Sequence, residues 1–66
     1  MTETIKEYGG RVIGYIETDG RGNKTVKSFG GRILGYYDRS SNVTKEFGGR
    51  IIFLGDMASA LLILYR

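Results

Sequence analysis

The stretch Ser28-Phe29-Gly30-Gly31-Arg32-Ile33-Leu34-Gly35-Tyr36 lies in the middle of this 66-residue chain and decides its fold. Its glycine pair supplies the positive φ angles that tight hairpin turns require, and β-branched, aliphatic and aromatic residues flank the pair. Two adjacent glycines would be costly inside a helix, which argues against a helical alternative. The stretch therefore predicts a β-hairpin that turns at Gly30-Gly31.

The same pattern occurs three times, in residues 5–15, 26–36 and 44–54, as an aromatic residue followed by Gly-Gly-Arg. A repeat of about 20 residues is typical of a supersecondary unit that buries its apolar face against its neighbours. We therefore expect one domain over residues 1–66. Its repeats are expected near residues 5–25, 26–43 and 44–55.

The fold class expected from these repeats is all-β, an antiparallel meander of about six short strands with a short apolar helix at the C-terminal end. The strands are expected near residues 3–8, 11–18, 24–29, 32–38, 43–47 and 50–54. The helix is expected over 56–65, because Asp56 is a good N-cap and helix-favouring residues follow it. A buried strand over 61–65 is the alternative.

A two-residue turn at Gly9-Gly10 would place Tyr8 opposite Arg11, Lys6 opposite Ile13 and Thr4 opposite Tyr15. Alternation then puts the basic and aromatic residues on one face, together with an aliphatic residue from each repeat: Ile13, Leu34 and Ile52. Gly14 and Gly35 lie on the opposite face, where the missing side chains would let a helix approach closely. We expect the C-terminal helix to pack on this glycine face.

The composition excludes several chemistries. The chain has no Cys and no His, so disulfides, thiol nucleophiles, imidazole bases and His/Cys zinc sites are impossible. The acidic residues are spread along the chain, so we expect no catalytic residues, no metal and no cofactor. A third and least favoured reading is an enzyme whose active site forms only at a symmetry axis.

Size and polarity predict an assembly. One small core supplies about 3–5 kcal/mol, and small domains without disulfides or metals commonly gain stability by oligomerising. The predicted helix is apolar nearly all round, so its second side is expected to meet another subunit. The expected partner is thus another copy of the chain, and the expected interface residues are Leu61, Leu62, Ile63 and Leu64. No signal peptide or membrane span is evident, so we expect a cytoplasmic protein without a membrane partner.

The threefold Lys-x-aromatic-Gly-Gly-Arg motif is the main candidate for function, as an anion site. Arginine matches phosphate oxygens bidentately, turn amides form an anion nest, and the aromatic ring offers a stacking plane. The alternative is that each aromatic ring only stacks on the arginine of its own turn. The candidate ligand-binding residues are Arg11, Arg32, Arg50, Tyr8, Phe29, Phe47, Lys6, Lys27 and Lys45.

The stretches Gly-Gly-Arg-Val-Ile-Gly-Tyr (9–15) and Gly-Gly-Arg-Ile-Leu-Gly-Tyr (30–36) resemble short hairpin-repeat families. The nearest are the small bacterial and phage "β-flower" proteins, and the chain is loosely similar to the YD repeats of Rhs-type shells. The resemblance covers about residues 5–54, and the third repeat departs from it with Phe53-Leu54. It implies an all-β repeat and carries over no activity or catalytic residue.

The favoured hypothesis for function is a non-enzymatic, oligomeric binding module that presents the Gly-Gly-Arg turns to an anionic partner. That partner would be a nucleotide-like ligand or nucleic acid. The alternative is a structural or protein-binding assembly module, such as a phage-type inhibitor, whose basic face meets an acidic protein.

Overall fold

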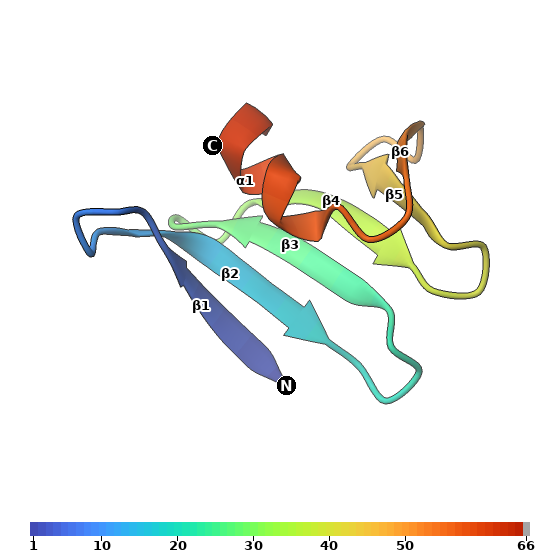
Figure 1. Ribbon diagram of the computed structural model, residues 1–66, viewed down its shortest axis with the longest axis horizontal. Helices are drawn as coiled ribbons and strands as arrows, with labels where there is room; N and C mark the ends of the chain where they lie inside the picture. Colours follow the sequence, from blue (N-terminus) through green and yellow to red (C-terminus); the bar gives the residue numbers. More distant parts are fainter. Residues whose placement is uncertain (66) are drawn as a thin grey trace.

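Six strands follow one another across a single antiparallel sheet, and one helix packs on one face of it (Figure 1). This computed structural model describes residues 1–65; Arg66, the last residue of the predicted domain, lies outside them. The predicted all-β meander is confirmed, and residues 61–65 are helical. The elements are β1 (Thr2–Lys6), β2 (Val12–Thr18), β3 (Lys24–Ser28), β4 (Ile33–Asp38), β5 (Val43–Glu46), β6 (Ile51–Leu54) and α1 (Ala58–Tyr65).

The three Gly-Gly turns share one geometry, which differs from the expected two-residue turn. In the first, the Gly10 N–H donates to the Glu7 carbonyl at 2.8 Å and the Glu7 N–H donates to the Arg11 carbonyl at 2.9 Å. The loop therefore has three residues, 8–10, and Gly10 has a φ of 89°. This is the hairpin loop in which a left-handed glycine forms a G1 bulge. Residues 28–32 and 46–50 repeat both hydrogen bonds.

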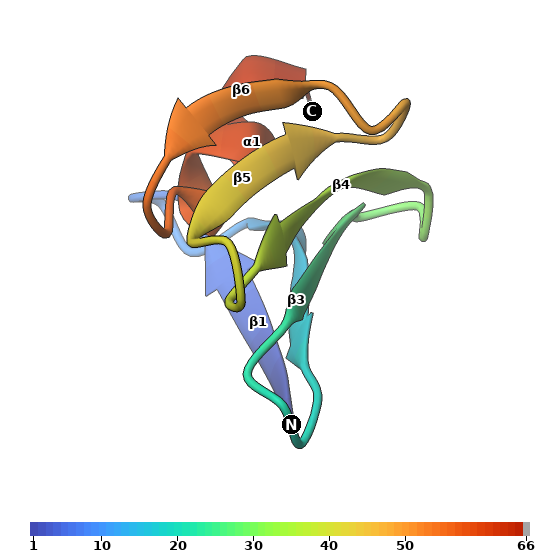
Figure 2. The same ribbon diagram turned by 90° about the vertical axis from the view of Figure 1, so that its right-hand side faces the viewer.

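A second irregularity follows each turn. Lys6 pairs with Val12, whereas Ile5 pairs with Gly14, so Ile13 is an extra residue in the ladder. Leu34 and Ile52 are the extra residues at the equivalent places in the other two hairpins. Each hairpin thus carries a β-bulge two residues after its arginine, and bulges bend a strand and increase its twist. The sheet is accordingly strongly twisted (Figure 2).

The bulges correct the predicted faces. Strict alternation placed Ile13, Leu34 and Ile52 on the side away from the helix, with Lys6 opposite Ile13. Instead, Leu34 is buried in the cluster that contains the helix residues Leu61 and Leu62, and Ile13 and Ile52 pack against this cluster. An extra residue shifts the alternation by one position, so an aliphatic side chain from each repeat joins the core. Beyond the bulge, Thr4 lies opposite Tyr15 as predicted.

Helix α1 packs against β2, β3 and β4 on the predicted glycine face. Leu61 and Leu62 are fully buried there. A Cβ built on Gly14 would collide with the Leu62 side chain, and one on Gly35 would lie 2.8 Å from the Cδ1 atom of Leu61. The two glycines therefore create the space into which the helix leucines fit.

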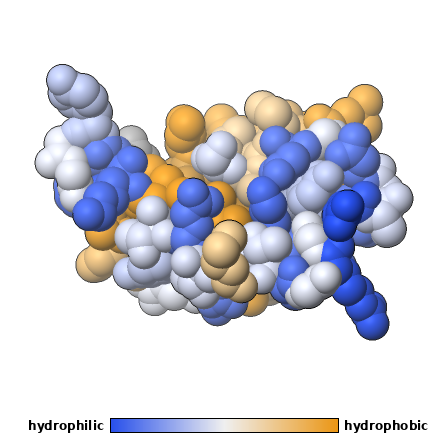
Figure 3. All heavy atoms as spheres, turned by 60° about the horizontal axis from the view of Figure 1, so that its bottom comes forward, coloured by the Kyte–Doolittle hydropathy of each residue, from blue (hydrophilic) through white to orange (hydrophobic). Residues whose placement is uncertain are grey.

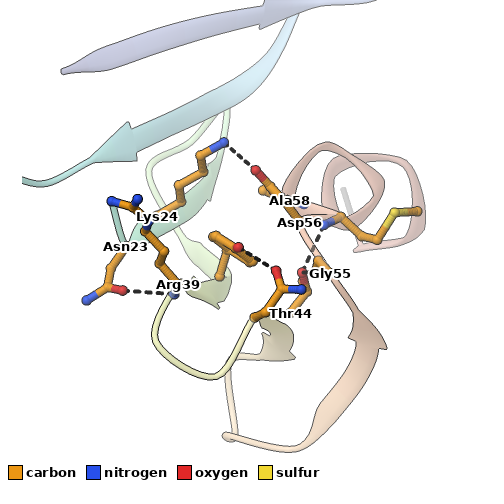
Figure 4. A network of polar contacts seen from close by, with 10 residues as sticks. Asn23, Lys24, Arg39, Thr44, Gly55, Asp56 and Ala58 are labelled. Atoms are coloured by element: carbon orange, nitrogen blue, oxygen red, sulfur yellow. Dashed lines mark hydrogen bonds and ion pairs between the residues drawn. The ribbon is translucent and has the colours of Figure 1, made fainter. Parts of the chain in front are cut away.

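Polar contacts fix the start of the helix against the sheet (Figure 4). The fully buried Thr44 hydroxyl donates to the Gly55 carbonyl at 2.8 Å and accepts the Met57 N–H at 2.9 Å. The Asp56 carboxylate accepts the Ala58 N–H at 3.2 Å and pairs with Lys24 at 2.6 Å. Asp56 therefore accepts the N–H of the first helical residue, but it lies two residues before the helix, which begins at Ala58 rather than at residue 56, so Met57 occupies the N-cap position.

Of the residues that the structure describes, none belongs to a helix long and apolar enough to cross a membrane.

The turn geometry predicts different costs for the two glycines of a pair. Gly31 has a φ of 91°, which is strained for a residue with a Cβ, whereas Gly30 is not in that region and a Cβ there meets nothing within 4 Å. We expect Gly31→Ala to cost about 1–2 kcal/mol of unfolding free energy. Gly30→Ala should change it by less than about 0.5 kcal/mol. Chemical denaturation measures both, and equal costs would contradict the three-residue loop.

Candidate anion-binding turns

The three Gly-Gly-Arg turns connect β1 to β2, β3 to β4 and β5 to β6, so an antiparallel meander places all three at the same end of its strands. Each aromatic residue is the first residue of its loop and is exposed to solvent. Tyr8 has a relative exposure of 104%, compared with 65% for Phe29 and 64% for Phe47. Their rings are therefore available as contact surfaces.

The three arginines are not equivalent. Arg11 pairs with Glu7, and Arg50 pairs with Glu46, each at 3.3 Å across its own turn. The matching position in the middle turn is Ser28, whose hydroxyl accepts the backbone N–H of Arg32 at 3.2 Å. Within the described residues, the Arg32 guanidinium has no acidic partner.

The predicted lysines divide in the same way. Lys27 pairs with Glu17 at 3.0 Å, and Lys45 pairs with Asp38 at 3.8 Å. In both pairs the acid belongs to the strand that precedes the lysine's own repeat. Lys6 has no preceding repeat, and no acid among residues 1–65 pairs with it. Lys6 and Arg32 are thus the predicted site cations that remain without an ion pair in the described chain.

The alternative in which each aromatic ring stacks on the arginine of its own turn is not what the structure contains. Among residues 1–65, the cation found over an aromatic ring is Lys24, 5.9 Å from the centre of Tyr37. At the first and third turns, the arginine lies against a carboxylate instead. A charged partner directly across the turn is a better match for a guanidinium than an exposed ring.

Arg11 and Arg32 are instead each brought to the aromatic residue of the following repeat. A hollow of about 760 Å³, hollow A, lies between the strand start that contains Arg11 and the turn that contains Phe29. A second of about 640 Å³, hollow B, lies between the segment that contains Arg32 and the turn that contains Phe47. The two hollows lie on either side of the middle hairpin, which contributes Phe29 to one and Arg32 to the other.

Two carboxyl groups have a lowered pKa. Hydrogen bonds from Ser40 are the main cause at Asp38, with smaller contributions from Ser41 and Lys45. At Asp56, burial is the largest single influence and opposes ionisation, but hydrogen bonds from Lys24 and the Ala58 amide outweigh it and lower the pKa. Both groups hold local structure and lie outside hollows A and B.

Within the described residues, no three acidic side chains come close enough together to hold a metal ion. The candidate chemistry is therefore that of the unpaired cations and the exposed rings.

The predicted interface residues fall into two pairs. Leu61 and Leu62 are fully buried within the chain, whereas Ile63 and Leu64 are 69% and 59% exposed. Contact with another subunit stays a prediction, and the exposed pair is the part of the helix that can make it. Exposed hydrophobic surface also occurs elsewhere, as the face drawn in Figure 3 shows between hydrophilic side chains.

The sequence itself contains a signal that distinguishes the three turns. The residue before each aromatic is Glu7, Ser28 or Glu46, and in a hairpin this residue lies directly across from the arginine. The glutamates in the first and third turns therefore mark the two arginines that have a counter-ion of their own.

Comparison of the chain with protein-family models, curated proteins and solved structures finds no match. The likeness to the β-flower and YD-repeat proteins stays a prediction.

Proposed function

We propose that the protein is a non-enzymatic binding module that holds a nucleotide-type anion at its middle turn. One observation carries this proposal: Ser28 replaces the glutamate that neutralises the arginine in both other repeats. The guanidinium donors of Arg32 are therefore available to an external anion. Those of Arg11 and Arg50 face Glu7 and Glu46.

The free energy that one arginine–anion contact can supply favours a nucleotide over a simple anion as the ligand. A hydrogen bond to a charged group contributes about 1.5–3 kcal/mol, which is less than the roughly 4 kcal/mol that corresponds to millimolar affinity. Stacking of a base on an aromatic ring adds about 1–3 kcal/mol. Phe29 and Phe47 lie in the hollows on either side of the Arg32 hairpin and are both largely exposed. In a nucleotide, the phosphate would bind the Arg32 guanidinium and the base would stack on one of these phenylalanine rings.

The sharpest test converts the middle turn into a copy of its neighbours. Ser28→Glu should give Arg32 its own counter-ion and weaken binding of a short single-stranded oligonucleotide roughly ten- to a hundredfold, the value of one charge-assisted contact. The fold should survive, because the neighbouring turns already carry a glutamate there. Calorimetric titration at low salt measures the affinity, and circular dichroism checks the fold.

Matched variants decide which arginine matters. Arg32→Gln should weaken binding like Ser28→Glu, and Arg32→Lys should weaken it less, because an ammonium keeps the charge but not the bidentate fork. Arg21→Gln, which removes the same charge in the loop between β2 and β3, outside hollows A and B, is the control and should leave affinity unchanged. Titrating a nucleoside monophosphate and inorganic phosphate in parallel separates stacking from charge. Equal losses for Arg32→Gln and Arg21→Gln, or no binding by the unmodified protein, would refute the proposal.

The second candidate is a structural or protein-binding assembly module. The observation that favours it is the edge strand β6, which contains no charged residue and exposes Ile51 and Leu54. Salt separates the two candidates, because binding to nucleic acid phosphates weakens steeply with salt whereas apolar association is much less sensitive.

A further inference from the structure

Hollows A and B have the same construction, one repeat apart. Arg11, Val12 and Ile13 line one side of hollow A, and Ser28, Phe29 and Gly30 line the other. Hollow B is lined on one side by a segment containing Arg32, Ile33 and Leu34, and on the other by Glu46, Phe47 and Gly48. Aligned on the repeat, these residues correspond position by position. Each hollow thus forms where the second strand of one repeat meets the turn of the next.

The strand pairing between repeats is also the same at both junctions. Between β2 and β3, Tyr15 lies opposite Lys27, and between β4 and β5, Tyr36 lies opposite Lys45. In each case the paired lysine forms an ion pair with an acid of the preceding repeat. One rule of register therefore joins consecutive repeats.

The two edge strands, β6 and β1, contain the positions that face each other in the β2–β3 and β4–β5 pairs, but here these positions have no neighbouring strand. At the β6 edge, Leu54 occupies the position of Tyr15 and Tyr36; it is 83% exposed, whereas both tyrosines are half-buried. At the β1 edge, Tyr8 is 104% exposed, against 65% and 64% for its two counterparts. Lys6, the counterpart of Lys27 and Lys45, lacks an ion pair within residues 1–65. Each edge thus exposes residues more fully than their counterparts at the two internal junctions are exposed.

We propose that copies of this chain join head to tail, with β6 of one copy pairing antiparallel with β1 of the next. The register of the internal junctions places Leu54 opposite Lys6 of the partner subunit and Phe53 opposite the partner's Glu7. A third hollow then forms, with Arg50, Ile51 and Ile52 on one side and the partner's Tyr8 on the other. This hollow does not exist in a single chain.

A second copy fits these edges better than an unrelated strand because the complementary surface is already encoded in the chain. Strand β6 has no charged residue, so this edge lacks the charges that commonly prevent an edge strand from pairing with another chain. Strand β1, in contrast, contains Glu3 and Lys6. Leu54 would cover the aliphatic stem of the partner's Lys6, as Tyr36 lies opposite Lys45. Such an interface is heterologous, so its repetition builds a ring or an open chain of copies. The proposal does not depend on anion binding.

Cysteine cross-linking tests the register directly, because the natural chain contains no cysteine. Opposite residues in an antiparallel ladder have Cα atoms about 4.5–5.5 Å apart, which suits a disulfide. Mixing Lys6→Cys and Leu54→Cys chains under mild oxidation should give a disulfide-linked dimer that neither variant forms alone. Lys6→Cys mixed with Phe53→Cys is the control and should link poorly, because a shift of one residue points the side chain to the other face.

Light scattering with charged variants gives an independent measurement. Leu54→Lys should convert the assembly into folded monomers, because this side chain is exposed in the single chain. Ile63→Lys is the matched control on the helix, 69% exposed, and should leave the assembly intact. The proposal is overturned if the unmodified chain is monomeric, or if Leu54→Cys links to itself as readily as to Lys6→Cys. Dissociation by Ile63→Lys but not by Leu54→Lys would also overturn it, in favour of the helix as interface.

Discussion

Replacing Gly35 with alanine is expected to leave the chain largely unfolded. The new Cβ would collide with the Lys45 carbonyl oxygen, and it would lie 2.8 Å from Leu61 Cδ1 and 3.2 Å from Glu46 Cα. Two of these three neighbours are backbone atoms of the adjacent strand, so relief requires opening the β4–β5 ladder or lifting the helix. Overpacking costs about 1–3 kcal/mol and occasionally more. Because the clash here is with backbone atoms, we expect a cost at the top of this range, which removes most of the roughly 3–5 kcal/mol that one small core supplies.

The matched control for this prediction is Gly30→Ala. Gly30 does not have a positive φ, and a Cβ there meets nothing within 4 Å, so the unfolding free energy should change by less than about 0.5 kcal/mol. Denaturation followed by circular dichroism measures both variants at one protein concentration, because association makes apparent stability depend on concentration. A Gly35→Ala protein that unfolds with the same midpoint as the Gly30→Ala control would show that the helix does not pack against this glycine.

The meander could be predicted from sequence because Gly-Gly pairs mark hairpin turns wherever apolar strands surround them. The register could be predicted only beyond the bulges. A three-residue loop shifts the pairing by one position, and the bulge at Ile13, Leu34 or Ile52 shifts it back. The two shifts cancel, so Thr4 pairs with Tyr15 as expected, while Lys6, between the turn and the bulge, does not pair with Ile13. The alternation of apolar and polar residues along a strand does not reveal a loop and a bulge whose register shifts cancel.

The sequence identified the residues of the candidate site, but not which of its arginines are neutralised by a carboxylate. The motif identifies Arg11, Arg32 and Arg50 equally, because each follows the same glycine pair. Only the cross-turn geometry shows that the residue preceding the aromatic meets the arginine, so that Ser28 leaves Arg32 available. The arrangement of Arg11 and Arg32 beside the aromatic residue of the next repeat is likewise a property of the strand order, which a single motif does not encode.

The apolar helix illustrates a different limit. Its composition predicts burial on more than one side. The side that packs on the sheet contains Leu61 and Leu62, which fill the space above Gly35 and Gly14. Composition alone cannot divide four consecutive aliphatic residues between a chain's own core and its surface. That division depends on which residues the helix turns towards the sheet.

The division predicts a large difference between two leucines of this helix. Leu61→Ala should lower the unfolding free energy by about 2–5 kcal/mol, because it empties part of a fully buried position that contacts the sheet. Leu64 is 59% exposed in the chain, so Leu64→Ala should cost far less, and both substitutions keep a strong helix former. Chemical denaturation compares the two variants at equal protein concentration.

The same pair of variants separates core packing from assembly. If Leu61 acts within the chain, its loss lowers the stability at every protein concentration by the same amount. If Leu64 contributes to contact between copies, its loss appears instead as a change in assembly mass, and as a stability difference that disappears on dilution. Equal destabilisation by Leu61→Ala and Leu64→Ala at low concentration would contradict the packing of α1 on the glycine face, because only the buried leucine contacts that face in a single chain.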